Sequence, residues 1–355
     1  MMWLNKVIVR PPLRACLAPG QGSRPRAWAQ CSAMTATSST TRADAAPVLC
    51  DALLRRFDAP GPRYTSYPTA DRFVEAFGPA DALRMLSQRA HGATVGGTSP
   101  LSVYVHIPFC ESVCYYCACN KVITKHHDRA AEYLDALDAE IGLVHAALGA
   151  SQPLSQLHFG GGSPTFLSDA ELDRVVTSLR RAFRIASHAE MSIEVDPRTV
   201  TPARLAHLRQ LGFNRISFGV QDFDPQVQQA VHRVQPYDSV RELMSSARAL
   251  GFESINADLI YGLPRQTPES FARTVQQIGE LRPDRIALYA YAHLPQRFKP
   301  QRRIVADELP SAAQRELTSS MRARSRPNGG HRAAAFELGH RTVAQRCRRR
   351  SGPSQ

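Results

Sequence analysis

Three cysteines in one short segment carry the strongest chemical signal in this 355-residue chain. Cys110, Cys114 and Cys117 are spaced four and three residues apart, so their thiolates can converge from one loop on a single metal centre. Thiolates favour zinc or iron-sulfur clusters. A structural zinc site takes four closed ligands, usually as two separated pairs, and no second pair is present. The spacing therefore favours a 4Fe-4S cluster with one iron open to a non-protein ligand, with zinc and inert core thiols as the alternatives.

Polar and glycine-rich groups follow the next predicted strands. The run Gly160–Gly162 would let the backbone approach a ligand without interference from a Cβ, although a plain tight turn explains it equally well. Glu194 closes a later strand, where a carboxylate can accept hydrogen bonds from a ribose diol or pair with a neighbouring Arg. Gln221 follows the fourth predicted strand, Asp258 lies in the fifth, and Arg233 lies between them. Each alone fits a solvated loop residue, but their recurrence at successive strand ends favours a binding site.

The elements that must position these residues alternate regularly from residue 102 onward. Short β-type runs are separated by segments with helical periodicity, and helix starts are marked by Ser168 with Glu171, by Thr201 and by Thr267. Six consecutive βα units predict a parallel sheet, because parallel strands need crossover connections. An α/β fold built as a partial, TIM-like (β/α)6 barrel is the simplest such architecture. The predicted strands are 102–109, 156–159, 191–195, 215–220, 254–260 and 285–291.

The net positive charge of the chain comes from its two ends. The formal net charge is +13, yet residues 1–43 hold six Lys or Arg and no acid, and residues 321–355 hold nine Arg and one acid. The segment between them is close to neutral. A nucleic-acid binder would normally carry its basic surface on a folded face. Nucleic acid is therefore not expected as a partner.

The cysteine spacing and the hydropathy bear on the compartment. Four of the eight cysteines fall within ten residues and the others are scattered, which does not resemble a disulfide framework. No stretch approaches the ~20 apolar residues of a membrane span. We expect a reducing, cytoplasmic location and a monomer. Residues 1–43 have the composition of an organellar transit peptide, but an unstructured leader is the preferred interpretation.

The cysteine motif at the first βα loop resembles the signature of the radical S-adenosylmethionine superfamily. Four further stretches make the resemblance more specific, to the family of oxygen-independent coproporphyrinogen III oxidases. They are RYTSYPT at 63–69, YVHIPFC at 104–110, CACNK at 117–121 and YAHLP at 291–295. The resemblance covers roughly residues 50–318.

The resemblance implies roles for individual residues. Cys110, Cys114 and Cys117 would hold the cluster, and Cys119 would lie beside it without ligating it. No catalytic side chain is assigned, with Cys119 and Arg63 as candidates. The implied cofactors are a 4Fe-4S cluster and two molecules of S-adenosylmethionine. Contacts to the first would come from Tyr104, Gly161 and Glu194, and contacts to the second from Tyr116, Gly162, Ser163, Gln221, Arg233, Asp258 and Ala292.

The reaction implied by the family is the oxidative decarboxylation of coproporphyrinogen III to protoporphyrinogen IX in haem biosynthesis. A 5'-deoxyadenosyl radical would abstract hydrogen from the propionate β-carbon, carbon dioxide would leave, and an acceptor would take one electron. The electron donor and acceptor are not identified. The four carboxylates of the substrate favour Arg or Lys partners, and Arg63 and Arg233 are candidates.

The resemblance ends at about Leu317, after which an Arg-rich stretch replaces the family pattern. We expect a truncated or frame-shifted chain that lacks the family's C-terminal domain and whose turnover is impaired. The predicted organisation is a disordered leader at 1–49, an N-terminal family segment at 50–100, the barrel at 101–300, and a helix remnant with a basic tail at 301–355. The alternatives are a haem chaperone of the same superfamily and a zinc-stapled basic nucleic-acid-binding protein.

Overall fold

A computed structural model describes residues 74–90, 100–149 and 152–320 of the chain. From Gly78 onward, these residues belong to one compact unit. The predicted leader, most of the N-terminal family segment with Arg63, and the basic tail beyond residue 320 lie outside the described residues. Among the helices that the structure describes, none combines the length and the apolar character needed to cross a bilayer.

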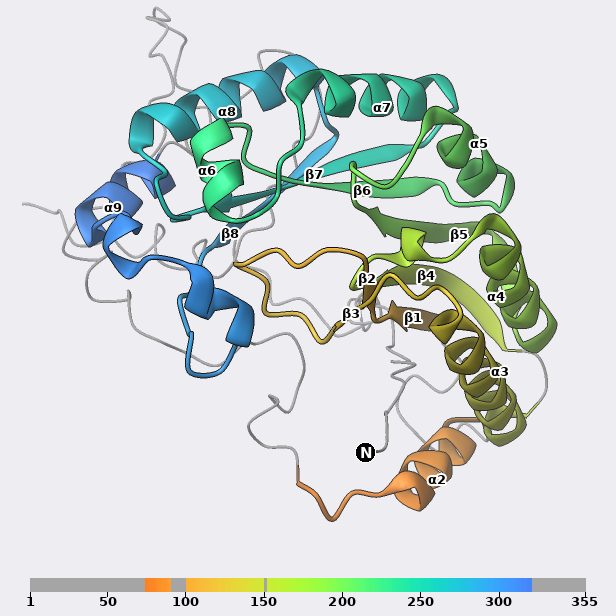
Figure 1. Cartoon of the computed structure of the whole chain (residues 1–355). Helices are drawn as coiled ribbons and strands as arrows, with labels where there is room; N and C mark the ends of the chain where they lie inside the picture. Colours follow the sequence, from red (N-terminus) through yellow and green to blue (C-terminus); the bar gives the residue numbers. More distant parts are fainter. Residues whose placement is uncertain (1–73, 91–99, 150–151, 321–355) are drawn as a thin grey trace, which may run out of the picture. The chain divides into compact units, whose positions relative to one another are not determined.

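The centre of the fold is one sheet of six parallel strands, which confirms the predicted class. The strands pair in the order in which they follow one another along the chain, with β1 and β8 at the edges. The sheet is therefore an open partial barrel, and Figure 1 shows its strands in an arc with the helices along the outer side. The strands are β1 (Leu101–Ile107), β4 (Pro153–Gly161), β5 (Arg184–Val195), β6 (Arg215–Gln221), β7 (Ser254–Tyr261) and β8 (Arg285–Ala290).

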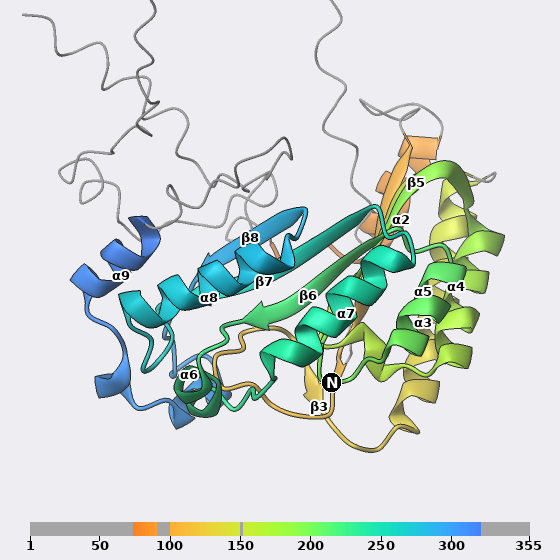
Figure 2. The ribbon, with the colours of Figure 1, turned by 90° about the horizontal axis from the view of Figure 1, so that it is seen from above.

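Helices connect successive strands across the outer face of the sheet. Figure 2 shows α3, α4, α5, α7 and α8 lined up on that side, as right-handed crossovers of a parallel sheet require. The helices are α2 (Pro79–Ala90), α3 (Arg129–Leu148), α4 (Asp169–Ala182), α5 (Pro202–Gln210), α6 (Pro225–Ala230), α7 (Tyr237–Ala249), α8 (Pro268–Leu281) and α9 (Ala312–Ser320). The described residues also form the short 3-10 turns η2 (Pro164–Phe166), η3 (Lys299–Arg303) and η4 (Ala306–Glu308).

Local sequence signals account for where these helices begin. The Ser168 hydroxyl accepts from the Glu171 backbone N–H while the Glu171 carboxylate accepts from the Ser168 backbone N–H, so the predicted capping box is present. Thr201 and Thr267 also cap their helices, each followed by a proline at the first helical position. Such caps satisfy backbone donors that the first helical turn leaves unpaired.

Three predicted strands differ from the structure by more than one residue at an end, and one of them, 156–159, is only the middle of β4. The run 102–109 divides into β1 and the short β2 (Phe109–Cys110), which pairs with β3 (Val122–Ile123). Pro108 separates them because it has no backbone N–H for a ladder, although its carbonyl accepts from Val122 N at 2.7 Å. The predicted strand 191–195 is only the last part of β5, whose earlier residues lack the alternating burial pattern that would have revealed it.

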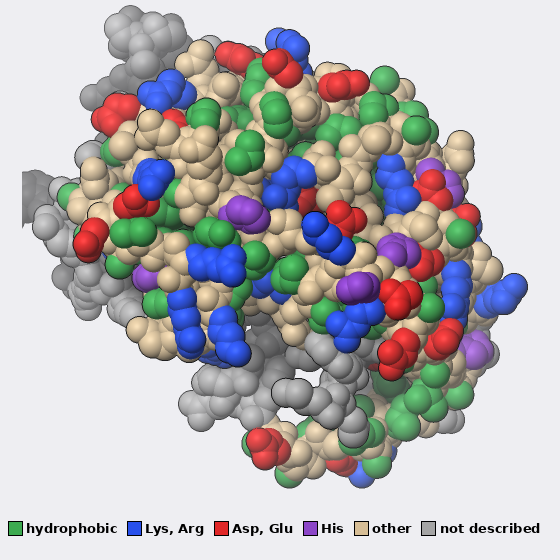
Figure 3. All heavy atoms as spheres, in the orientation of Figure 1, with side chains coloured by type: hydrophobic (Ala, Val, Ile, Leu, Met, Phe, Trp, Pro, Cys, Tyr) green, Lys and Arg blue, Asp and Glu red, His purple; other side chains and the backbone are tan. Residues whose placement is uncertain are grey.

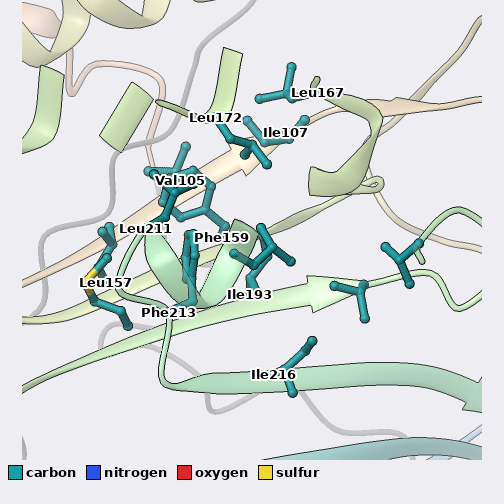
Figure 4. Packing of buried hydrophobic residues seen from close by; sticks show 14 of the residues in the cluster. Val105, Ile107, Leu157, Phe159, Leu167, Leu172, Ile193, Leu211, Phe213 and Ile216 are labelled. Carbon is teal, nitrogen blue, oxygen red and sulfur yellow. The ribbon is translucent and has the colours of Figure 1, made fainter. Parts of the chain in front are cut away.

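The hydrophobic core lies between the sheet and the helices. Every second residue of β1 is buried against α3 and its neighbours, which produces the alternation typical of one covered face. Phe159 of β4 and Phe213, before β6, meet edge to face with ring centroids 5.2 Å apart. Figure 4 shows both rings packed with Val105 and Ile193. The opposite, inner face of the strands is left for other side chains.

Candidate functional site

The inner face of the sheet is lined with partly buried polar side chains. Tyr104 on β1 lies in register with His158 on β4, and the two rings stack with centroids 5.6 Å apart. The Tyr104 hydroxyl is 3.0 Å from His106 Nδ1, and His106 Nε2 is 2.9 Å from the Asn120 carbonyl oxygen. Further inner-face residues on the later strands are Ser192, Glu194, Ser217, Asn256 and Asp258. Convergent polar groups of this kind are what fixes the orientation of a ligand in a binding site.

Glu194 connects β5 to the glycine run. Its Oε1 lies 3.2 Å from His158 Nε2, and its Oε2 accepts a hydrogen bond from Gly161 N at 3.3 Å. The partner of this carboxylate is thus an imidazole rather than the arginine that its sequence context allowed. The side chain is 44% exposed, so it remains accessible to a ligand.

The glycine run is packed tightly between neighbouring strands. Gly162 N donates to the Ile107 carbonyl at 2.7 Å, and Ser163 N donates to the Phe109 carbonyl at 2.8 Å. A Cβ at Gly162 would lie 2.7 Å from the Phe109 carbonyl oxygen, and one at Gly161, where φ is +120°, would lie 2.8 Å from His106. Close strand approach therefore explains the glycines. Since their N–H groups are used within the protein, their carbonyl groups are what the run can offer a ligand.

The cysteine segment starts with the last residue of β2, Cys110, and continues in the loop that follows it, at the carboxyl end of the strands. The side chain of Cys114 is buried, those of Cys110 and Cys117 are partly buried, and Cys119 is exposed. Burial, followed by the nearby thiols of Cys117 and Cys114, raises the pKa of Cys110 to about 12. A hydrogen bond from Cys119 lowers the pKa of Cys117 to about 5 and raises the pKa of Cys119. The thiols are thus close enough to influence one another.

The donor set of this loop fits a thiolate-ligated cluster in its chemistry. Within the described ranges, no three His, Cys, Asp or Glu side chains are already arranged to hold a metal ion. The three soft sulfur ligands nevertheless come from one loop, and thiolates are the ligands of iron-sulfur clusters. Two positive groups lie beside one of the three sulfurs, since Arg198 and Arg233 both donate to Cys114 Sγ.

Arg233 is buried and held by several partners. Its Nη1 lies 3.1 Å from Asp196 Oδ2 and 3.4 Å from Cys114 Sγ, and its Nη2 donates to the Gly219 carbonyl at 2.7 Å. Its Nε is buried and has no hydrogen-bond partner among the described residues. An unsatisfied buried donor costs free energy, so this atom is a candidate contact for a ligand.

The basic segment η3 packs against the two tyrosines of the cysteine loop. Gln301 in η3 is 1% exposed and donates from Nε2 to the Tyr116 carbonyl at 3.1 Å. Arg303 lies over the Tyr115 ring, with its Cζ 5.2 Å from the centroid. Figure 3 shows Lys and Arg side chains gathered over the segment that carries η3. Burial raises the pKa of Tyr116 well above its usual value, so this phenol stays neutral.

Asp258 on β7 carries a partly buried carboxyl in a hydroxyl and amide network. Its Oδ2 accepts from Ser217 Oγ at 2.8 Å, and its Oδ1 accepts from Asn256 Nδ2 at 2.8 Å. Burial, opposed by the Ser217 hydrogen bond and reinforced by the charge of Glu194, raises the pKa of Asp258 to about 6. The group therefore changes its charge close to neutral pH.

The raised pKa of Asp258 predicts a specific pH dependence of stability. The folded chain binds this proton more tightly than the unfolded chain, so the contribution is fully present below about pH 4 and is lost as pH rises to about 6. The loss amounts to about 2–3 kcal/mol. Urea unfolding between pH 4 and 7 is expected to show this component, and Asp258→Asn, which cannot ionise, is expected to remove it. An unchanged pH profile in the variant would contradict the assignment.

Other predicted residues occupy the same end of the sheet with fewer contacts. Gln221 ends β6 at a register irregularity with φ +67°, and its Nε2 lies 2.9 Å from the position of a Cβ on Gly219. The Ser163 hydroxyl is 3.1 Å from Thr165 Oγ1 and is therefore engaged within the protein. Ala292 follows β8 and is exposed. The structure thus links Glu194 with Gly161, and Arg233 with Cys114.

The sequence reasoning missed several polar residues at this site. His106 and His158 face inward from buried strands, and their alternation with apolar neighbours was the available signal. Asp196 and Arg198 follow β5, where strand-end chemistry was expected, but nothing in the sequence showed that Arg198, paired with Asp196, would reach Cys114. Such pairing between distant loops depends on tertiary structure.

Comparison with known proteins defines the class first. A family model described as the radical SAM superfamily matches residues 104–278, which hold the cysteine loop and most of the sheet. The solved structure of coproporphyrinogen III oxidase from Escherichia coli, described as a radical SAM enzyme, superimposes with a TM-score of 0.72 at 44% identity. That match covers 78% of this chain and 61% of the other. The chain belongs to the radical SAM superfamily.

The curated relatives are more specific. The oxygen-independent coproporphyrinogen III oxidase of Pseudomonas aeruginosa is 52% identical over 265 residues, which is 74% of this chain and 56% of that protein. The protein of the same name from Escherichia coli is 49% identical with the same coverage. The chain thus spans about half the length of these relatives. Its family implies a 4Fe-4S cluster and S-adenosylmethionine as cofactors.

Proposed function

We propose that this chain is the radical-generating part of an oxygen-independent coproporphyrinogen III oxidase. The observation that carries the proposal is the cysteine loop at the carboxyl end of an open parallel sheet, in a segment 52% identical to a protein of that name. The polar inner face beside this loop supplies groups for a polar cofactor. Coproporphyrinogen III is the proposed substrate.

Cys110, Cys114 and Cys117 are the proposed ligands of the cluster. When bound, the cluster and S-adenosylmethionine supply one-electron chemistry that generates a carbon radical for hydrogen abstraction. Tyr104, Gly161 and Glu194 are the proposed contacts of S-adenosylmethionine. The hydrogen bond from Gly161 N to the Glu194 carboxylate supports this set of contacts, because it holds the glycine run and the carboxylate next to each other.

A second S-adenosylmethionine is proposed beside Arg233. The unpartnered Nε of Arg233 and the partly buried Asp258 side chain support this position. The remaining proposed contacts are Tyr116, Gly162, Ser163, Gln221 and Ala292. Gly162 and Ser163 would contribute through atoms other than their backbone N–H groups, which are donated to Ile107 and Phe109.

Arg233 is a weaker candidate for the substrate carboxylates than the sequence indicated. Its two terminal nitrogens already donate to Asp196, Gly219 and Cys114. A guanidinium used in this way has lost the paired donors that make Arg a strong carboxylate receptor. Recognition of the substrate carboxylates is therefore assigned to other cationic side chains. Arg63, the other candidate, lies outside the described residues.

The proposal is tested by two separate assays on the anaerobically reconstituted chain. Dithionite as the electron source and S-adenosylmethionine are expected to yield 5'-deoxyadenosine, which chromatography measures. With coproporphyrinogen III added, mass spectrometry detects any loss of carbon dioxide. Absence of 5'-deoxyadenosine from a chain with full iron and sulfide content would contradict the radical function, and haem binding without cleavage would favour the chaperone alternative.

A further inference from the structure

Two guanidinium groups from separate loops meet at the sulfur of Cys114. Arg233 Nη1 lies 3.4 Å from Cys114 Sγ, and Arg198 Nη2 lies 3.6 Å from it. Arg198 follows β5, whereas Arg233 follows α6, so the contact depends on the tertiary fold. Placing two cations together in a partly buried site is costly unless an anion compensates them.

Asp196 supplies that compensation and fixes both arginines. Its Oδ2 lies 2.6 Å from Arg198 Nη2 and 3.1 Å from Arg233 Nη1, and its Oδ1 accepts from Arg198 Nε at 3.0 Å. The side chain of Asp196 is 13% exposed, that of Arg233 is 8% exposed and that of Arg198 is 22% exposed. The three groups therefore form a shielded clamp around one sulfur, in which the bonds to Asp196 set the direction of both guanidiniums.

The clamp places a net positive charge beside the Cys114 sulfur. Two cations and one carboxylate leave a net positive charge beside Cys114, and charged donors form the stronger class of hydrogen bond. Hydrogen bonds to ligating sulfurs and local charge are two of the factors that set the reduction potential of iron-sulfur clusters. A positive charge stabilises the reduced form, because reduction adds an electron.

We propose that Arg198 and Arg233, clamped by Asp196, are positioning residues that orient the Cys114 sulfur and raise the reduction potential of the cluster it ligates. The inference rests on the proposed function, since it requires Cys114 to hold a cluster. It adds a role for Arg198 and Asp196. It also explains why Arg233 directs Nη1 at Cys114.

The test compares cluster potentials by redox titration followed by electron paramagnetic resonance on anaerobically reconstituted protein. Arg198→Gln removes one cation and is expected to lower the reduction potential of the cluster. At a fixed applied potential, the ratio of reduced to oxidised cluster is expected to fall about tenfold, which corresponds to a decrease of about 59 mV for one electron. Arg198→Lys keeps the charge but loses the forked donors, so a smaller shift in the same direction is expected.

Arg174→Gln is the matched control. Arg174 on α4 pairs with Asp135 and Asp138 of α3, so its loss removes the same charge without touching the clamp. This variant is expected to keep the original potential.

The outcomes separate the inference from the proposed function. An unshifted potential in Arg198→Gln with full iron content would overturn the inference alone, as would an equal shift in the Arg174→Gln control. If Arg198→Gln does not fold by circular dichroism, an unshifted potential in Arg198→Lys overturns it instead. Failure of the unmodified chain to form any cluster would overturn the proposed function and, with it, the inference.

Discussion

Replacing Cys114 by alanine (Cys114→Ala) is expected to abolish cluster assembly and, with it, the cleavage of S-adenosylmethionine. Cys114 is the buried member of the three cysteines, and two guanidinium groups donate hydrogen bonds to its sulfur. Residues that only support metal ligands contribute about 10–100-fold to metal affinity, so the loss of a ligand is expected to cost more. Iron content, visible absorption and 5'-deoxyadenosine formation measure the effect after anaerobic reconstitution.

Cys119→Ser is the matched control in the same loop. Cys119 is exposed and shares a hydrogen bond with Cys117, which a serine hydroxyl can still make. This variant is expected to retain most of its iron, whatever its effect on turnover. Equal iron loss in Cys114→Ala and Cys119→Ser would contradict the assignment of Cys110, Cys114 and Cys117 as the ligand set.

Gly161→Ala is expected to destabilise the fold by roughly 2–4 kcal/mol, through backbone strain and overpacking. Gly161 has φ +120°, and a Cβ there would lie 2.8 Å from the His106 ring and from the Ile107 carbonyl oxygen. His106 cannot turn aside without losing its contacts to Tyr104 and Asn120. Urea unfolding measures the change in the free energy of unfolding.

Gly142→Ala serves as the comparison for that substitution. Gly142 lies within α3, and no atom outside its own helical neighbourhood lies within 4 Å of the added Cβ. The change is expected to stabilise the chain by up to about 1 kcal/mol, because alanine has the higher helix propensity. If Gly161→Ala proved as stable as Gly142→Ala, the close packing of β4 against β1 would be refuted.

Periodicity and local chemistry predicted the sheet and most of its helices. Alternating burial in β1 and the caps at Ser168 and Thr201 are local signals, which the sequence carries directly. The division at Pro108 and the early start of β5 at Arg184 were missed. The first depends on a missing backbone donor, and the second lies in a stretch without hydrophobic alternation.

The candidate site was predictable in its location but only partly in its contacts. Cys110 and Glu194 lie at or next to the carboxyl ends of β2 and β5, as the sequence predicted, whereas Asp258 lies in the middle of β7. The clamp of Asp196 on Arg198, and the pairing of Glu194 with His158, join residues from different loops and strands. No local pattern encodes which side chains meet across such distances, so the structure was needed to find them.

The most direct test of the central claim is the determination of iron and acid-labile sulfide in the anaerobically reconstituted chain. Cys110, Cys114 and Cys117 are predicted to bind about four iron and about four sulfide per chain as a 4Fe-4S cluster. Addition of S-adenosylmethionine is predicted to change the electron paramagnetic resonance signal of the reduced cluster. A colourless protein containing one zinc, or one without metal after reconstitution, would contradict the account.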